Sequence, residues 1–163
     1  MAFDILTFTD SLANLIDKNN TTTSSYNVSL SLTSKVVRVR TGYHRDKPIP
    51  NTDYPCIWVE PKRSSNEFNT TGRTALRDIT LDYEIIAITN YGMGLEDGRE
   101  RADREMLKLS SNLEILLRNY PRLSTTSQVM SSLISDVEYG VIESNETYNS
   151  MARLNLNIKI HST

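Results

Sequence analysis

The chain has 163 residues, with 18 Lys and Arg against 20 Asp and Glu, a formal net charge of −2 and one cysteine. This length is typical of a single domain with a substantial core, and the near-balanced charge gives no overall attraction to nucleic acid or to a membrane surface. The lone Cys56 excludes a disulfide framework, and the amino terminus has no signal-peptide pattern, so we expect a reducing compartment. No apolar run approaches the roughly 20 residues of a membrane span, so we expect no membrane partner.

The first third of the chain is expected to form one helix and then mostly loop. Apolar residues recur at steps of three and four over residues 4–18, which predicts a short amphipathic helix. Alternation over residues 27–32 indicates a short strand, and the alternation of valine with arginine over residues 37–40 indicates another strand or an extended arm. Residues 41–53 contain glycine and two prolines and are predicted to be loop.

Two prolines bracket the next predicted strand. Residues 54–61 read Tyr-Pro-Cys-Ile-Trp-Val-Glu-Pro, and Pro55 and Pro61 are expected to mark its ends because proline cannot donate to a strand ladder. The polar residues 62–77 that follow are too long for a tight turn. We therefore expect an extended hairpin loop or arm around residues 60–78.

Residues 79–121 give the clearest pattern, a long strand, a glycine-rich turn and a long helix. Residues 79–88 place apolar side chains on one face of a strand, while the other face begins polar. Asp97 is expected to cap the helix, and Pro121 follows its end. The apolar side of this helix is predicted to contain Ala102, Met106, Leu109, Leu113, Leu116 and Leu117.

Two further strands are predicted after this helix. They cover residues 133–141 and 152–160, with a turn over residues 143–149. Alternation gives each strand one buried and one wet face, which favours an antiparallel or mixed sheet. We therefore predict one α+β domain over residues 1–163, with a mainly antiparallel or mixed sheet of about four to five strands and two helices packed on one face.

No catalytic signature is found in the sequence, so we expect no enzyme and no cofactor. The turn Gly-Met-Gly-Leu-Glu-Asp-Gly (residues 92–98) lies where a phosphate-binding loop could lie, but its spacing differs from the known fingerprints and its two acids would repel a phosphate. A tight turn is favoured over a nucleotide site. His44, His161 and Cys56 have no metal-ligand spacing, so no metal site is predicted.

Charge is distributed unevenly along the chain. Residues 35–77 hold nine Lys or Arg against four acids, whereas the start of the long helix is rich in acids. Such regions could form head-to-tail contacts between copies, or the basic loops could face nucleic acid. On the helix, Glu100 and Asp103 are most simply part of a solvated face with ion pairs, with a charged subunit contact as the alternative. Trp58 is either a core residue or an interface anchor.

The order of the predicted parts is similar to that of a known family. A Tyr-Pro-x-Ile-x-Val strand (residues 54–59) follows a helix and a proline-rich loop, and a long polar arm (residues 60–77) comes next. A long strand ending near Tyr91, a helix ending in Leu-Glu-Ile-Leu-Leu (residues 113–117) and two closing strands complete the order. In this arrangement, over residues 4–161, the chain resembles the tail terminator (tail completion) proteins of tailed bacteriophages, which are related to head–tail neck proteins.

The resemblance implies a structural virion protein of the tail and neck, assembled in the host cytoplasm, without covalent chemistry. It implies a homo-oligomeric ring, usually a hexamer, that caps the tail tube, stops polymerisation of the tube protein and joins the head-completion or neck proteins. Genome DNA would pass through its channel without sequence-specific binding. The alternatives are a head–tail adaptor or stopper of the neck and, in another class, a small nucleotide-binding or nucleic-acid-binding domain. The residues expected at interfaces are Lys62, Arg63, Arg73 and Arg77 on the arm, and Trp58, Glu100 and Asp103 elsewhere.

Overall fold

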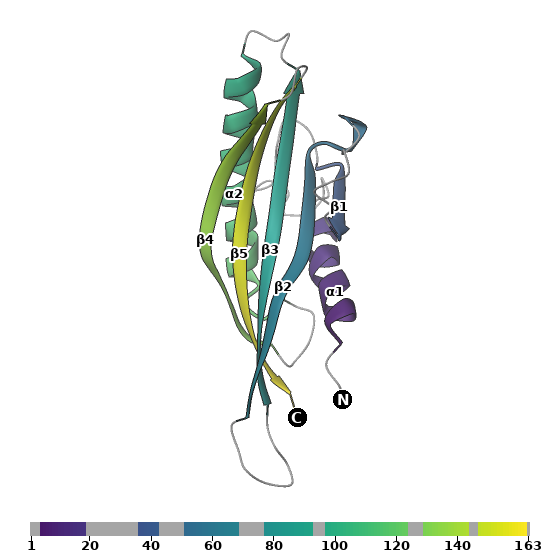
Figure 1. Ribbon diagram of the computed structural model, residues 1–163, viewed down its shortest axis with the longest axis vertical. Helices are drawn as coiled ribbons and strands as arrows, with labels where there is room; N and C mark the ends of the chain where they lie inside the picture. The colour runs from purple at the N-terminus through teal and green to yellow at the C-terminus, as the bar shows by residue number, and fades with distance from the viewer. Residues whose placement is uncertain are drawn as a thin grey trace.

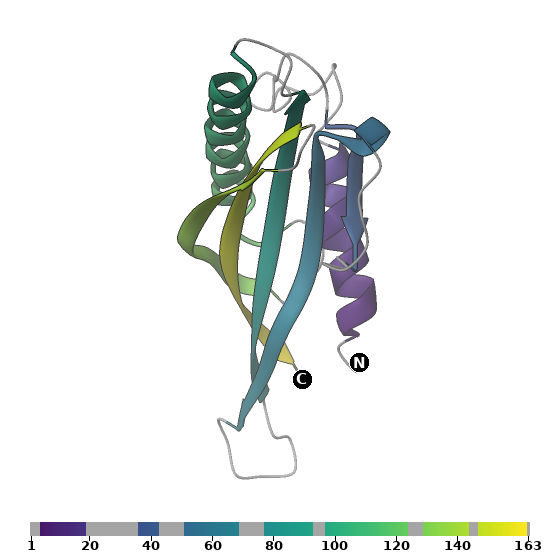
Figure 2. The ribbon, with the colours of Figure 1, turned by 45° about the horizontal axis from the view of Figure 1, so that its top comes forward.

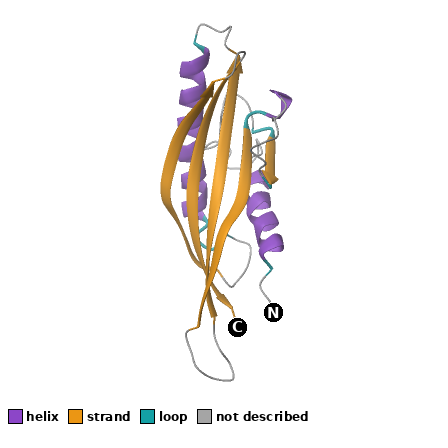
Figure 3. Cartoon of the chain, viewed as in Figure 1, coloured by secondary structure: helices purple, strands orange, loops and turns teal. Residues whose placement is uncertain are grey.

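The computed structural model describes residues 4–18, 36–42, 51–68, 77–92, 97–123, 129–143 and 147–162. Within these residues the chain forms helices and long strands, labelled in Figure 1 and coloured by type in Figure 3. In chain order the elements are α1 (Ile5–Lys18), β1 (Arg38–Thr41), the short 3-10 helix η1 (Asn51–Asp53), β2 (Cys56–Phe68), β3 (Arg77–Gly92), α2 (Gly98–Asn119), β4 (Val129–Glu143) and β5 (Thr147–Ser162).

The strands form one mixed sheet in the order β1-β2-β3-β5-β4. β1 runs parallel to β2, and the other neighbouring pairs are antiparallel. Both helices cover the same face, α1 against β1 and β2, and α2 against β3 and β5, as Figures 1 and 2 show. This side is termed the helix face, and the other side the open face. The predicted α+β fold with two helices on one face of the sheet is confirmed for the described residues.

The main core fills the helix face. Leu81, Tyr83 and Ile85 of β3 are at most 1% exposed and belong to the cluster that contains the apolar sides of both helices. The Tyr83 hydroxyl shares a 2.8 Å hydrogen bond with Oγ1 of Thr9, and its ring centroid lies 5.8 Å from that of Phe8. A buried hydroxyl thus keeps a partner, as it must in an apolar core. The predicted apolar residues of α2 are all buried here, so that prediction is confirmed.

The open face is not wholly wet, and this corrects the expectation of one buried and one wet face. A second cluster contains Cys56, Ile86, Ile88 and Met151, with Trp58 packed against it. Ile86 is 0% exposed although its strand neighbours point to the main core. Further along the strands the open face becomes polar. Sequence alternation therefore identified the helix face but underestimated burial on the other side.

Several strand limits differ from the predictions. β2 continues through Pro61, and the register shifts between Pro61 and Arg63, a bulge at which a missing N–H does not break the ladder. Residues 60–68 and 77–78 of the predicted arm are therefore strand residues of the sheet, in which β5 pairs with the other side of β3, while residues 69–76 lie outside the described part. β4 and β5 also begin earlier than predicted. The strand predicted over residues 27–32 lies outside the described residues.

The start of α2 also differs from the prediction. Asp97 occupies the N-cap position, but its side chain makes no capping hydrogen bond. Its backbone carbonyl accepts a 3.0 Å hydrogen bond from the N–H of Arg101. At the other end the helix stops before Tyr120, and Pro121 follows it as expected. The helix boundary was thus correct although the capping chemistry was not.

Candidate interaction surfaces

The ends of β2 and β3 extend past the helices, and β5 pairs with β3 along this extension. Figure 1 shows both strands continuing beyond the ends of α1 and α2. Their ladder runs from the Arg63–Asp82 pair to the Phe68–Arg77 pair. Arg63 is exposed, whereas Ile79 on the helix face is only 9% exposed. A hydrogen-bonded hairpin holds its side chains in fixed positions, so it can present Arg63 to another molecule.

Lys62 lies in the bulge where this arm begins, and its charge is already engaged. Its Nζ lies 2.6 Å from Oε2 of Glu84 and 3.1 Å from Oε2 of Glu60. The Glu84 side chain is only 9% exposed, and Nε of Arg153 approaches its other oxygen at 4.0 Å. The hydrogen bond with Glu84 raises the pKa of Lys62, against desolvation. Lys62 therefore balances a buried carboxylate, while Arg63 next to it faces solvent.

Trp58 has different neighbours from those of Lys62, and the remaining arm arginines are not fully described. Arg73 lies outside the described residues, and Arg77 opens β3, with its backbone opposite Phe68 and Ser162. Trp58 is half-buried on the open face, where the guanidinium of Arg40 lies 5.8 Å from the ring centroid. Trp58 therefore lies at the edge of the second cluster, and the guanidinium of Arg40 covers part of its ring.

The two predicted acids of α2 have different roles. Glu100 is exposed and its Oε1 lies 2.8 Å from the guanidinium of Arg104, an i,i+4 pair of the predicted kind. Asp103 is half-buried and accepts a 2.5 Å hydrogen bond from Oγ of Ser150 on β5. Exposed pairs contribute little to stability, about 0.3–0.5 kcal/mol. Glu100 thus belongs to a solvated helix side, whereas Asp103 anchors α2 to the sheet.

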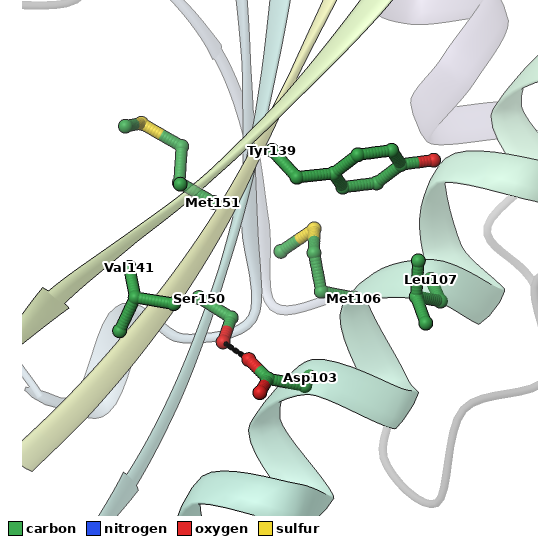
Figure 4. A pocket seen from close by; sticks show the side chains of 8 residues that line it. Asp103, Met106, Leu107, Tyr139, Val141, Ser150 and Met151 are labelled. Carbon is green, nitrogen blue, oxygen red and sulfur yellow. Dashed lines mark hydrogen bonds between the residues drawn. The ribbon is translucent and has the colours of Figure 1, made fainter.

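A groove lies between α2 and the β4 border of the sheet (Figure 4). It has a volume of about 460 Å³ and is mostly apolar. Leu107 and Tyr139 are each 54% exposed and Val141 is 42% exposed. The Tyr139 hydroxyl lies 3.0 Å from Oγ of Ser110, which orients its ring toward α2. The groove is lined by Asp103, Met106, Leu107, Tyr139, Gly140, Val141, Ser150 and Met151.

The two border strands carry opposite charges, which the sequence predictions did not include. On β1, Nε of Arg38 and Nη2 of Arg40 approach the carboxylate of Asp53 at 3.6 and 3.0 Å, so two cations share one acid. On β4, Asp136 and Glu138 are exposed. The alternation of residues 37–40 was visible in the sequence, but only the sheet order shows that this strand and β4 are the two borders.

In the described part of the chain, no group of three or more His, Cys, Asp or Glu could hold a metal ion. No helix in that part is long and apolar enough to cross a membrane. Cys56 is buried, and burial raises the pKa of its thiol to about 11. In comparisons with known proteins, no family model and no curated protein sequence matches the chain.

Proposed function

We propose that the protein is a structural virion protein of a tailed bacteriophage, a tail terminator that forms a ring on the end of the tail tube. In this role it stops polymerisation of the tube protein and presents a surface to the head-completion or neck proteins. The proposal starts from the resemblance in the order of the parts. It requires no covalent chemistry, because contacts and symmetry carry out the function.

The projecting β2–β3 hairpin is the observation that carries this proposal. A ring protein must reach a neighbouring subunit or the tube below it, and a hydrogen-bonded strand extension, in which β5 also pairs with β3, is suited to that contact. Arg63 is the described arm residue that best fits a charged contact, because it is exposed on the same strand on which Lys62 is already paired. The other interface residues of the prediction remain proposals, with Arg73 outside the described residues.

The open face supports the idea of a channel wall that does not hold DNA tightly. Its described cations and acids nearly balance, so it offers no broad positive surface that would retain the phosphate backbone. The cations on or beside this face are Arg38, Arg40, Lys62, Arg63, Arg153 and Lys159. The acids are Asp53, Glu60, Asp78, Asp82, Glu84, Asp136 and Glu138.

Two alternatives are separated from this proposal by experiment. A head–tail adaptor or stopper of the neck would form rings that bind neck proteins without stopping tube growth. A nucleotide-binding or nucleic-acid-binding domain would act without a tube. Thermal unfolding with added nucleotides, and salt-dependent DNA binding, would each give a signal for the latter but not for a terminator.

The test is electron microscopy of the chain mixed with polymerising tube protein from the same phage. We expect rings at tube ends and shorter tubes as the chain concentration rises. Arg63→Glu should weaken end binding at least about tenfold, equivalent to about 1.4 kcal/mol. Arg118→Glu is the matched control, because Arg118 is also exposed but lies on α2, paired with Glu114. Compact monomers that leave tube length unchanged would refute the proposal.

A further inference from the structure

The two border strands of the sheet run in opposite directions. β1 is parallel to β2, and three successive antiparallel pairings lead from β2 to β4. Figure 2 shows β1 and β4 at opposite borders of the same sheet. A second copy placed beside the first without inversion would therefore bring its β1 antiparallel to β4. Antiparallel ladders are the slightly more stable kind, and both helix layers would stay on one side.

The two border strands also match in their position along the strand direction. Following the pairings across the sheet, Arg40 is level with Trp58, Ile86, Arg153 and finally Glu138. A neighbouring copy needs no shift along the strands to set its Arg40 opposite Glu138. Such placement is what a closed ring around an axis along the strands requires, because every copy then lies at one level.

At this register the open faces of the two strands are complementary in charge. Arg40 would lie directly opposite Glu138, with Asp136 as its diagonal neighbour. Directly opposed residues of antiparallel strands have Cβ atoms about 4.5–5.5 Å apart, within reach of an ion pair. Arg40 now shares Asp53 with Arg38, so these cations outnumber their acid by one.

The helix faces of the two strands are complementary in a different way. Val39 would lie opposite Tyr139, and Thr41 opposite Val137. Tyr139 is 54% exposed, and Val141, two residues further along β4, is 42% exposed. Covering these side chains removes apolar surface from water. It also closes the solvent-exposed side of the groove between α2 and β4. Four ladder residues alone make a small contact, and this apolar coverage enlarges it.

Pairing of β4 with another β4 is disfavoured by the same residues. An antiparallel β4 pair centred on Val137 would set Asp136 of one copy opposite Glu138 of the other, in both halves of the contact. Directly opposed like charges destabilise strand pairs. β4 is a long border strand with exposed apolar residues. Its acids thus disfavour pairing with the β4 of another copy, while β4 remains complementary in charge to β1.

We infer that β1 of one copy adds to β4 of the next, antiparallel and with Arg40 opposite Glu138, so that the sheets of neighbouring copies join head to tail. This inference rests on the proposed ring function and names the surface through which copies associate. The occupant of the groove side of β4 is therefore a second copy of this chain.

Charge reversal tests this contact. Glu138→Arg alone and Arg40→Glu alone should each raise the concentration needed for assembly at least about tenfold, measured by mass photometry. An equimolar mixture of the two variants should restore assembly. The altered β4 of Glu138→Arg then meets the altered β1 of Arg40→Glu, and the unaltered β4 of Arg40→Glu meets the unaltered β1 of Glu138→Arg, so every contact pairs opposite charges. Arg118→Glu should leave assembly unchanged. Circular dichroism establishes that each variant is folded.

A cross-link gives a second readout that does not depend on charge. Glu138→Cys mixed with Arg40→Cys should form a disulfide-linked dimer under mild oxidation. Lys159→Cys mixed with Arg40→Cys should not, because Lys159 lies on β5, not on the border strand, and is six residues along β5 from Arg153, the residue paired with Glu138.

Each outcome separates this inference from the proposed function. Folded variants that still form rings at the original concentration, or that fail to rescue each other, overturn the strand contact and leave the ring function standing. Charge-dependent oligomers that do not stop tube growth support the contact and refute the terminator. A chain that stays monomeric even on tube ends overturns both.

Discussion

The buried thiol of Cys56 should make the protein sensitive to alkali in a calculable way. Cys56 is 1% exposed, and burial raises its pKa from 9.0 to about 11, against an opposing hydrogen bond with Trp58. At about 1.4 kcal/mol per unit of pKa, the rise corresponds to about 3 kcal/mol. Because the folded chain holds this proton more tightly than the unfolded chain, the stability is present below pH 9 and is lost progressively as the pH rises toward 11.

The assay compares the original protein with Cys56→Ala by urea unfolding below pH 9 and near pH 11. The substitution should cost about 1 kcal/mol at the lower pH, because a small buried side chain is shortened. On moving to the higher pH, the variant should lose about 2 kcal/mol less stability than the original protein, because the folded thiol is only half ionised at its own pKa. Lys62 and Tyr83, whose pKa values are also raised, titrate in both proteins, so their effects cancel in the comparison.

Equal losses of stability in the two proteins would refute this account of Cys56. So would rapid labelling of the folded protein by a thiol reagent below pH 9, because a buried, protonated thiol should react only through unfolding. Ser111→Ala, at an exposed position of α2, controls for the effect of a substitution that changes no buried group.

Two further predictions concern the packing of the sheet. Leu113→Ala, at a 0% exposed position, should lower the free energy of unfolding by about 2–5 kcal/mol, whereas Leu107→Ala, at a 54% exposed one, should stay within about 0.5 kcal/mol in urea unfolding. Lys62→Met should lower the free energy of unfolding by about 1 kcal/mol more than Arg63→Met, because it leaves the buried Glu84 carboxylate without its nearest cation. The difference is kept small because the Lys62 side chain is partly solvated. Similar losses for the two members of either pair would contradict these assignments.

Much of the fold followed from periodicity because the helix face is buried continuously. The apolar sides of both helices, and the inward residues of β3 and β5, alternate or recur without interruption. The ends of the strands were harder to predict, because β2 continues past Pro61 through a bulge that has no recognisable local sequence pattern. The burial of Ile86 was also missed, because a short apolar run in a strand with a polar start gives no sign of what covers it.

The candidate surfaces were harder to predict than the fold. Arg63 and Glu100 are exposed as expected, but the charge of Lys62 is paired with Glu84, and Asp103 is hydrogen-bonded to Ser150. A sequence shows a residue's charge but not its partner, and these partners lie on other strands. The matching of the two borders depends on sheet order and register, which are properties of the whole chain.

The border strands illustrate how one set of residues can both prevent and permit association. β4 is 15 residues long and carries exposed apolar side chains, the features that make a sheet edge prone to uncontrolled pairing. Asp136 and Glu138 oppose pairing with another β4, because the same acids would meet. β1 presents arginines on the corresponding face and is only four residues long, so it limits how much of β4 it can cover. Growth through such a contact is directional, since each copy offers one strand of each kind, and it stops when the last β4 meets the first β1.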